Sequence, residues 1–169
     1  SDFVSSVSPS AALMNMGMIE TLIGATIADI YGLLYERDGV LQPGMAAIWI
    51  RCENGAGVRL LGSSDGMHLR CDQEFPWPFD MQEDGAYVLI SLSGRNPWSM
   101  VRGQSITQLS EVVSNETGDA IGVGLEGGGG CVLFLLHLGD ELKVFDVLPS
   151  EVVAQENAEV RRTNSRGLT

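Results

Sequence analysis

The alternation of hydrophobic and polar positions along the chain predicts a molecule built mostly of short strands. In residues 45–53, the side chains of Ile48, Ile50 and Cys52 lie on one face, which is the spacing of a half-buried strand. Asn54-Gly55 is a strong signal for a tight turn between antiparallel strands. Similar patterns predict further strands at residues 26–36, 58–61, 68–71, 86–92, 105–114, 120–126, 131–138 and 142–147.

The same order of patterns occurs twice, which predicts an internal repeat. Residues 19–73 align with residues 98–147 when Gly24 is placed on Gly103 and later positions are matched likewise, as for Ala47 on Ala120, Val58 on Cys131 and Asp65 on Asp140. The copies differ in length in their connections, where loops tolerate insertions. We expect each copy to form a short helix, a glycine stop and a four-stranded antiparallel meander.

The helix expected in each copy lies before its first strand. Residues 11–23 have apolar side chains at roughly helical spacing. We expect this helix to end at Gly24, because glycine is common just past a helix. In the second copy, Asn96-Pro97 suits a helix start, and residues 98–102 lead to Gly103. The predicted fold class is therefore α+β, with two tandem copies of a short helix plus a four-stranded meander that form a largely antiparallel sheet or sandwich.

The length of the chain fits one domain made of two related halves. The 169 residues and the 44% share of hydrophobic residues suffice for one core without disulfides. We expect a single domain over residues 1–153 and a polar, frayed tail over residues 154–169. The two pseudo-symmetric halves span about residues 10–73 and 96–153 and are joined by residues 74–95.

Two strand patterns carry additional information about packing. Residues 131–136 are apolar at every position, so both faces of this strand are expected to be covered, near the centre of the protein. The apolar positions in residues 105–114 do not alternate cleanly. This irregularity favours a bend or a bulge in the first strand of each copy.

The charge of the chain limits the kinds of partner that it can bind. Ten lysine and arginine residues against 22 aspartate and glutamate residues give a formal net charge of −12, whereas binding to nucleic acid or to an anionic membrane needs a cationic surface. The excess of acid favours a basic partner, although it is also typical of a protein that its charge keeps in solution. Residues 1–4 show no signal-peptide pattern, and Glu20 and Asp29 interrupt the apolar stretch 14–34, so we expect a cytoplasmic protein.

No group of residues in the sequence has the spacing of a catalytic or metal centre. Cys52, Cys71 and Cys131 stand apart in strand patterns and are expected to be small buried side chains. His68 and His137 have no carboxylate at ligand or triad spacing. A Gly-x-Gly-x-x-Gly match in the second copy lies inside a strand pattern, whereas a dinucleotide site needs it between a strand and a helix. We therefore expect no enzyme activity, no cofactor and no metal.

The segment between the two copies combines acidic and aromatic residues. Its candidate contact residues are Glu74, Trp77, Phe79, Asp80, Glu83 and Asp84. Aromatic side chains supply anchor area at protein interfaces, and carboxylates attract a basic partner. The alternative is that Trp77 and the neighbouring phenylalanines turn inward and cap the core. Carboxylates expected to be exposed on the second copy are further candidates, at Glu111, Glu116 and Asp119.

The second copy resembles the small bacterial immunity-type proteins of toxin systems. The resemblance rests on Ala-Ile-Gly-Val-Gly-Leu-Glu at residues 120–126, a glycine turn, an apolar strand, and Gly-Asp-Glu-Leu-Lys-Val at residues 139–144. It covers the last third of the chain and carries over no site residues. It implies a compact, acidic, cytoplasmic protein that blocks a toxin by binding it.

These observations lead to three functional hypotheses. The first is a binding protein that neutralises a cognate bacterial toxin, with a basic toxin domain as its partner, by occluding it through the acidic and aromatic surface. The second is a small-molecule-binding or enzymatic β-domain with a pocket between the two halves. The third is a structural subunit that forms a homodimer or larger homo-oligomer through an exposed sheet edge.

Overall fold

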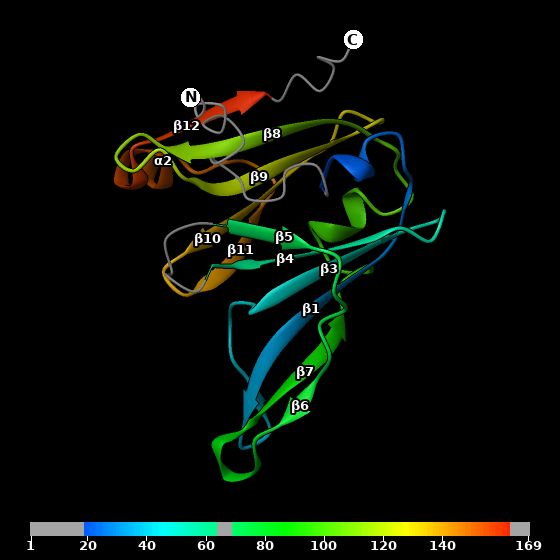
Figure 1. Cartoon of the computed structure of the whole chain (residues 1–169), viewed down its shortest axis with the longest axis vertical. Coiled ribbons are helices and arrows are strands. Elements are labelled where there is room, and N and C mark those ends of the chain that lie inside the picture. Colours follow the sequence, from blue (N-terminus) through cyan, green and yellow to red (C-terminus); the bar gives the residue numbers. More distant parts are fainter. Residues whose placement is uncertain (1–18, 64–68, 163–169) are drawn as a thin grey trace, which may run out of the picture.

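The first half of the chain forms one antiparallel sheet. The computed structural model describes residues 19–63 and 69–162 (Figure 1). The strands of the first sheet are β1 (Ile27–Arg37), β2 (Val40–Leu41), β3 (Ala47–Cys52), β4 (Gly57–Gly62), β5 (Leu69–Asp72), β6 (Phe79–Asp80) and β7 (Ala86–Ser91). Their order across the sheet is β5-β4-β3-β1-β7-β6, and β2 pairs with the end of β1.

The second half of the chain forms a second antiparallel sheet. Its strands are β8 (Ile106–Ser114), β9 (Ala120–Gly127), β10 (Val132–Leu138), β11 (Glu141–Phe145) and β12 (Ala158–Arg162), in the order β11-β10-β9-β8-β12. Each predicted strand has a counterpart whose ends differ from the prediction by at most two residues. The prediction of a largely antiparallel β-structure is therefore confirmed.

The helical part of the prediction is not confirmed. Residues 11–18 lie outside the described residues, and the next turn, η3 (Glu20–Leu22), is a short 3-10 helix. Two further 3-10 helices are η4 (Gln82–Asp84) and η5 (Trp98–Met100). The one α-helix within the described ranges is α2 (Ser150–Glu156), which follows β11. The described chain is thus mostly antiparallel β rather than α+β.

The main core lies between the two sheets. Ile48 and Ile50 of β3 meet Leu109 of β8 and Leu135 of β10 in one cluster, and all four side chains are fully buried. Burial of one such side chain contributes about 1.5–3 kcal/mol. The alternation that predicted the strands is therefore also what joins the two sheets.

A smaller core covers the outer face of the second sheet. Val112 of β8, Ile121 of β9 and Leu136 of β10 are buried there, and Val152 of α2 packs against them. The neighbouring Leu135 of β10 belongs to the main core. Both faces of β10 are therefore covered, as its unbroken apolar sequence predicts.

The chain after α2 is ordered, which corrects the prediction of a frayed tail. Strand β12 pairs antiparallel with β8, from Ala158 opposite Ser114 to Arg162 opposite Ser110. The prediction is wrong for residues 154–162, because residues 154–156 belong to α2 and pairing with β8, rather than apolar content, places residues 158–162. Residues 163–169 lie outside the described residues.

The two sheets are joined where β1 and β8 begin. The backbone N–H of Gly24 donates to the carbonyl of Ile106 at 2.7 Å, and the N–H of Gly103 donates to the carbonyl of Ile27 at 2.8 Å. The register of β1 shifts just after Ile27, and that of β8 just after Ile106. These shifts agree with the irregularity expected from the sequence.

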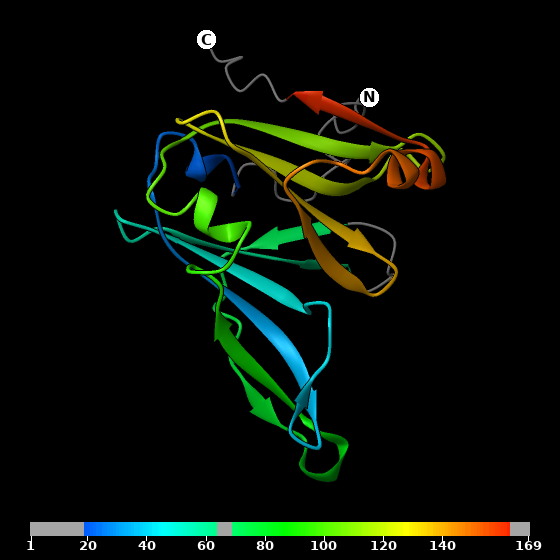
Figure 2. The ribbon, with the colours of Figure 1, turned by 180° about the vertical axis from the view of Figure 1, so that it is seen from behind.

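One end of the first sheet projects beyond the second sheet. Figures 1 and 2 show β1, β2, β6 and β7 continuing away from the body of the molecule. We call residues 34–42 and 79–88 the arm. Residues 74–95, which were expected to join the two halves and to include a strand at residues 86–92, add β6 and β7 to the first sheet, with Tyr87 opposite Tyr35 of β1.

Candidate functional site

The segment between β5 and β6 crosses the outer face of the first sheet. β5 and β6 are at opposite edges of this sheet, so residues 73–78 must pass over the strands between them. The ring of Phe75 lies 5.3 Å from the ring of Trp49 on β3, and the ring of Trp77 lies 4.8 Å from that of Phe75. Trp49 faces away from the core because its neighbours Ile48 and Ile50 face into it. We call residues 73–78 the crossing segment.

A glycine on the neighbouring strand makes room for Trp49. Gly57 of β4 has no side chain, and a Cβ atom there would lie 2.2 Å from Cζ2 of the Trp49 ring. The indole therefore lies over bare backbone of β4. Gly57 is opposite Arg51, and the next pair on the same face of these two strands is Trp49 opposite Arg59.

An ion pair anchors the start of the crossing segment. Arg59 Nε donates to Asp72 Oδ1 at 2.8 Å, Arg59 Nη2 donates to Asp72 Oδ2 at 2.5 Å, and the backbone N–H of Glu74 donates to Asp72 Oδ1 at 3.1 Å. The side chains of Arg59 and Asp72 are 18% and 15% exposed, so this is not an ordinary surface pair. Burial raises the pKa of Asp72, but the hydrogen bonds and the charge of Arg59 outweigh it, so the pKa lies below its ordinary value.

A second group of rings lies on the arm. The ring of Phe79 is 5.0 Å from that of Tyr87, and the ring of Tyr87 is 5.5 Å from that of Tyr35. These residues share one face because Tyr87 is directly opposite both Phe79 and Tyr35 in the sheet. The hydroxyl of Tyr35 donates to the carbonyl of Asp84, which ties the η4 turn to β1.

The rings on this side of the molecule are exposed. Trp77 is 73% exposed and Phe79 is 53% exposed, whereas Phe75 is half-buried against Trp49. The alternative prediction, that Trp77 and its neighbours cap the core, is therefore wrong. We call Tyr35, Trp49, Phe75, Trp77, Phe79 and Tyr87 the aromatic face.

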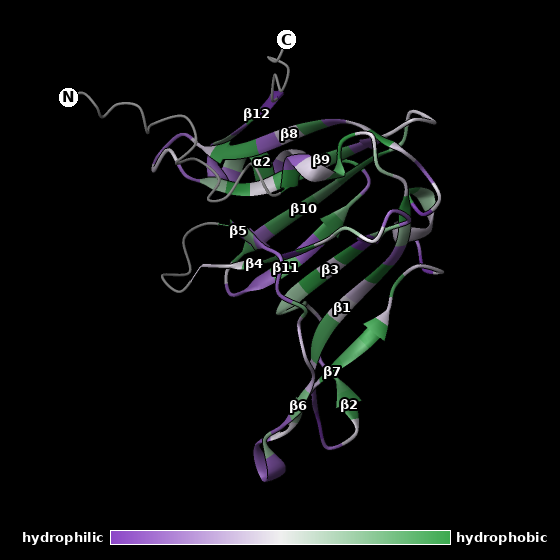
Figure 3. Cartoon of the chain, turned by 45° about the vertical axis from the view of Figure 1, so that its right-hand side comes forward, coloured by the Kyte–Doolittle hydropathy of each residue, from purple (hydrophilic) through white to green (hydrophobic). Residues whose placement is uncertain are grey.

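Carboxylates lie at both ends of the aromatic face. Glu74, Asp80, Glu83 and Asp84 are all exposed. Figure 3 shows the hydrophilic η4 turn at the tip of the arm, next to the apolar strands β2 and β7. The structure therefore places Asp80, Glu83 and Asp84 on the arm with Phe79, whereas Glu74 starts at the opposite edge of the first sheet, 3.7 Å from Arg59.

The other three candidate carboxylates lie elsewhere. Glu116 and Asp119 are in the connection between β8 and β9, on the second sheet and away from the arm (Figure 1). Glu116 is exposed as expected, but Asp119 and Glu111, which is in β8 opposite Arg161, are half-buried, so the expectation of exposure is wrong for these two. Burial raises the pKa of Glu111 although Arg161 acts against this shift.

Four members of the aromatic face were not among the candidate residues, and one of them, Phe75, lies within the predicted segment itself. Trp49 could have been found, because the assignment of Ile48 and Ile50 to the core places residue 49 on the opposite face. Tyr35 and Tyr87 could not, because their contact depends on the register between two strands far apart in the sequence.

The histidines and cysteines do not form a reactive group in the described part of the chain. His137 is buried, and His68 lies outside the described residues. Burial raises the pKa of the Cys71 thiol to about 12, with a smaller effect from Asp72, so the reactive thiolate is disfavoured. Within residues 19–63 and 69–162, no three or more histidine, cysteine, aspartate or glutamate side chains are placed to hold a metal ion.

Comparisons of the chain with protein-family models, with curated proteins and with solved structures found no match. In the described ranges, no helix combines the length and the apolar composition needed to cross a membrane. The function must therefore be inferred from the geometry and chemistry of the chain itself.

Proposed function

We propose that this protein is a binding protein whose aromatic face docks on a basic protein partner. The observation that carries the proposal is the exposure of Trp77 and Phe79, at 73% and 53%, beside the exposed carboxylates of the 74–84 segment. Aromatic residues dominate the binding energy of many interfaces. Carboxylates around them speed the approach of a cationic surface and select against acidic ones.

The partner that we propose is a basic toxin domain, which the protein neutralises by covering its active surface. The resemblance of residues 120–126 and 139–144 to immunity-type proteins supports this choice, as does the formal net charge of −12. The arm projects from the body of the molecule (Figures 1 and 2), and a projecting surface suits insertion into a concave site. Three free cysteines support the cytoplasmic location that belongs to this proposal.

We also propose that the two halves are copies of one unit, which explains the meander in each sheet. The exchange of hydrogen bonds between Gly24 and Ile106 and between Gly103 and Ile27 supports this, because the alignment places Gly24 on Gly103. The hydroxyl oxygens of the aligned residues Thr26 and Ser105 lie 3.0 Å apart, as expected for positions on a two-fold axis. The arm would then be an addition to the first copy, which is consistent with a special role.

The proposal is tested by capture of partners from an extract of the cells that produce the protein. The wild-type chain should retain a basic protein, and the double variant Trp77→Ser with Phe79→Ser should lose it. A matched control is Val147→Ser with Val160→Ser, since these side chains are 73% and 47% exposed but lie outside the aromatic face. Retention of the same partner by the Trp77 and Phe79 variant, or capture of no basic protein by the wild type, would contradict the proposal.

A further inference from the structure

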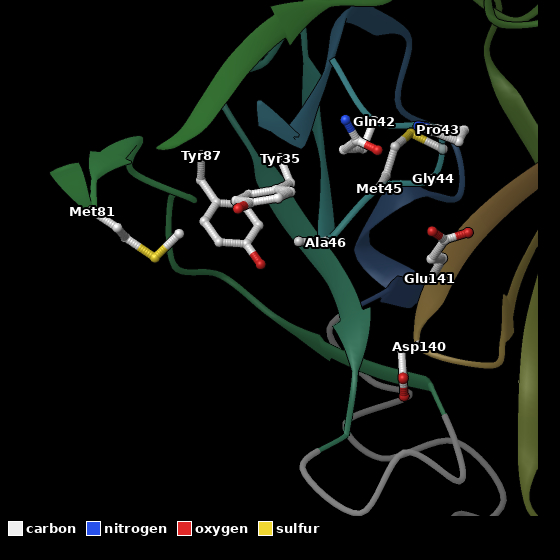
Figure 4. A pocket seen from close by; sticks show the side chains of 10 residues that line it. All are labelled: Tyr35, Gln42, Pro43, Gly44, Met45, Ala46, Met81, Tyr87, Asp140 and Glu141. Atoms are coloured by element: carbon white, nitrogen blue, oxygen red, sulfur yellow. The ribbon is translucent and has the colours of Figure 1, made fainter. Parts of the chain in front are cut away.

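A cleft opens where the arm leaves the body of the molecule. Its volume is about 530 Å³, and Figure 4 shows side chains from both sheets around it. Tyr35 and Tyr87 of the arm line one end, and Asp140 and Glu141 at the start of β11 line the other. The cleft therefore combines the edge of the aromatic face with carboxylates that come from the second sheet.

The charged residues of this cleft are all acidic. Its lining contains the carboxylates of Asp140 and Glu141 and no lysine, arginine or histidine. None of the ion pairs within residues 19–63 and 69–162 involves either carboxylate. Neither carboxylate is thus held in an ion pair within the described part of the molecule, which makes an anionic ligand unfavourable and a cationic one favourable.

A glycine fixes the position of the Glu141 carboxylate. Gly44 has a φ of +86°, and a Cβ atom at this residue would lie 2.2 Å from Cδ of Glu141 and 2.4 Å from its Oε1. The carboxylate therefore rests on bare backbone, where only glycine combines the left-handed conformation with the free space. Glu141 is held at the cleft rather than extended into solvent.

The other end of the cleft presents aromatic and thioether groups. The rings of Tyr35 and Tyr87 are tilted by 48° at a centroid distance of 5.5 Å, and the bond from the Tyr35 hydroxyl to Asp84 holds the first ring in place. Met81 lines the cleft on this side, whereas Met45 lines it next to Gly44 and pairs with Leu142 of β11. Aromatic faces attract organic cations, and the polarisable sulfur atoms of methionine adapt to the alkyl chain that carries such a cation.

We propose that this cleft receives a protonated alkylamine or guanidinium group, supplied by a lysine or arginine side chain of the basic partner. The charged end of that side chain meets Asp140 and Glu141, and its methylene groups pack against Tyr35, Tyr87 and the methionines. The assignment of this cation to a side chain of the partner rests on the proposed function, whereas the affinity of the cleft for the cation does not. The cleft extends the aromatic face and adds selectivity for a single basic residue.

The first test is a titration of the labelled full chain with small cations, and two-dimensional NMR is the readout. Nα-acetyl-L-arginine amide and Nα-acetyl-L-lysine amide are the probes, and Nα-acetyl-L-citrulline amide is the neutral control of almost the same shape. We expect saturable shifts at Gly44, Tyr35 and Glu141 with at least one cationic probe, and none with citrulline amide. Equal binding of the citrulline compound, or no saturable shift with either cation, would overturn the inference.

The second test uses variants that remove single charges. Glu141→Gln should weaken binding of the cationic probe at least about fivefold, because a charge-assisted contact is lost. Asp140→Asn, in an exposed turn, should also weaken binding of the cationic probe and serves as a second variant. Asp146→Asn is the matched control, since this exposed carboxylate follows the other end of β11 and lies outside the cleft. Equal affinities for all three variants and the wild type would refute the assignment.

Two further measurements distinguish a failure of the cleft assignment from a failure of the proposed function. Spermidine is titrated in parallel, and binding of spermidine without binding of either amino-acid amide would overturn the assignment to a partner side chain. The Trp77→Ser and Phe79→Ser variant should still bind the arginine or lysine probe, because neither residue lines the cleft. If a variant loses partner capture but still binds the probe, the effect therefore belongs to the aromatic face alone. If a variant loses probe binding but still captures the partner, the effect belongs to the cleft alone.

Discussion

Replacement of Phe75 by leucine tests whether ring contacts hold the aromatic face together. Phe75 lies between Trp49 and Trp77, at centroid distances of 5.3 Å and 4.8 Å, and both contacts are edge-to-face. Such a pair contributes about 0.5–1.5 kcal/mol beyond the burial of apolar area. Leucine keeps most of that area but removes both pairs, so the free energy of unfolding should fall by about 1–3 kcal/mol.

A double-mutant cycle separates the ring contact from other effects of the substitution. Phe75→Leu, Trp49→Leu and the double variant are unfolded in urea, with circular dichroism as the signal. The two substitutions should couple by about 0.5–1.5 kcal/mol. Phe145→Leu combined with Trp49→Leu is the control, because Phe145 is half-buried on the other sheet. If the two cycles agree within about 0.3 kcal/mol, the reasoning from ring geometry is refuted.

Three further predictions concern charge. Arg59 and the hydrogen bonds to the Asp72 carboxylate lower the pKa of Asp72 despite its burial. Asp72 therefore stabilises the fold at pH values above its ordinary pKa, and this contribution is lost as the pH falls through the pKa of the folded state. Urea unfolding from about pH 6 downward should therefore show a weaker acid dependence for Asp72→Asn than for the wild type, and identical profiles would contradict this. Burial raises the pKa of Glu111, so its contribution is present at low pH and lost as pH rises through the raised value. Glu111→Gln should be more stable than the wild type at neutral pH, with a gap that closes in acid, as measured by thermal unfolding. Reversal of Glu83 and Asp84 to lysine should slow association with the captured partner at low salt and have less effect at about 0.5 M salt, when measured by surface plasmon resonance. Unchanged association at low salt would remove these two carboxylates from the interface.

The strands could be predicted because burial dictates their sequence. β3 has one face in the core, which gives alternation at residues 48–52, whereas β9 and β10 are buried on both faces, and β10 accordingly has an unbroken apolar run. β12 could not be predicted in this way. Its residues are largely exposed, and pairing with β8 holds them in place. A strand at a sheet edge leaves little trace in the pattern of hydrophobic residues.

The candidate surface was predicted in part for a similar reason. The composition of residues 74–84 indicates acids and aromatics near one another, but not which way the rings turn. Their direction follows from the positions of β5 and β6 at opposite edges of the first sheet, which forces the crossing segment over its outer face. That order is a long-range property of the fold, and Glu111 was misplaced because its exposure depends on β12.

Two prolines explain how Trp77 stays exposed. Pro76 is buried and Pro78 is exposed on either side of it, and proline has no backbone N–H to contribute to a strand ladder. The crossing segment therefore lies over the sheet without becoming one of its strands or offering a new edge for aggregation. Proline also restricts its own backbone and that of the residue before it, so Trp77 has few conformations open to it. In the binding role that we propose, less backbone entropy is then lost at this residue when the partner binds. An exposed tryptophan in a flexible loop would lack this advantage, which is why the prolines favour a binding role for this surface.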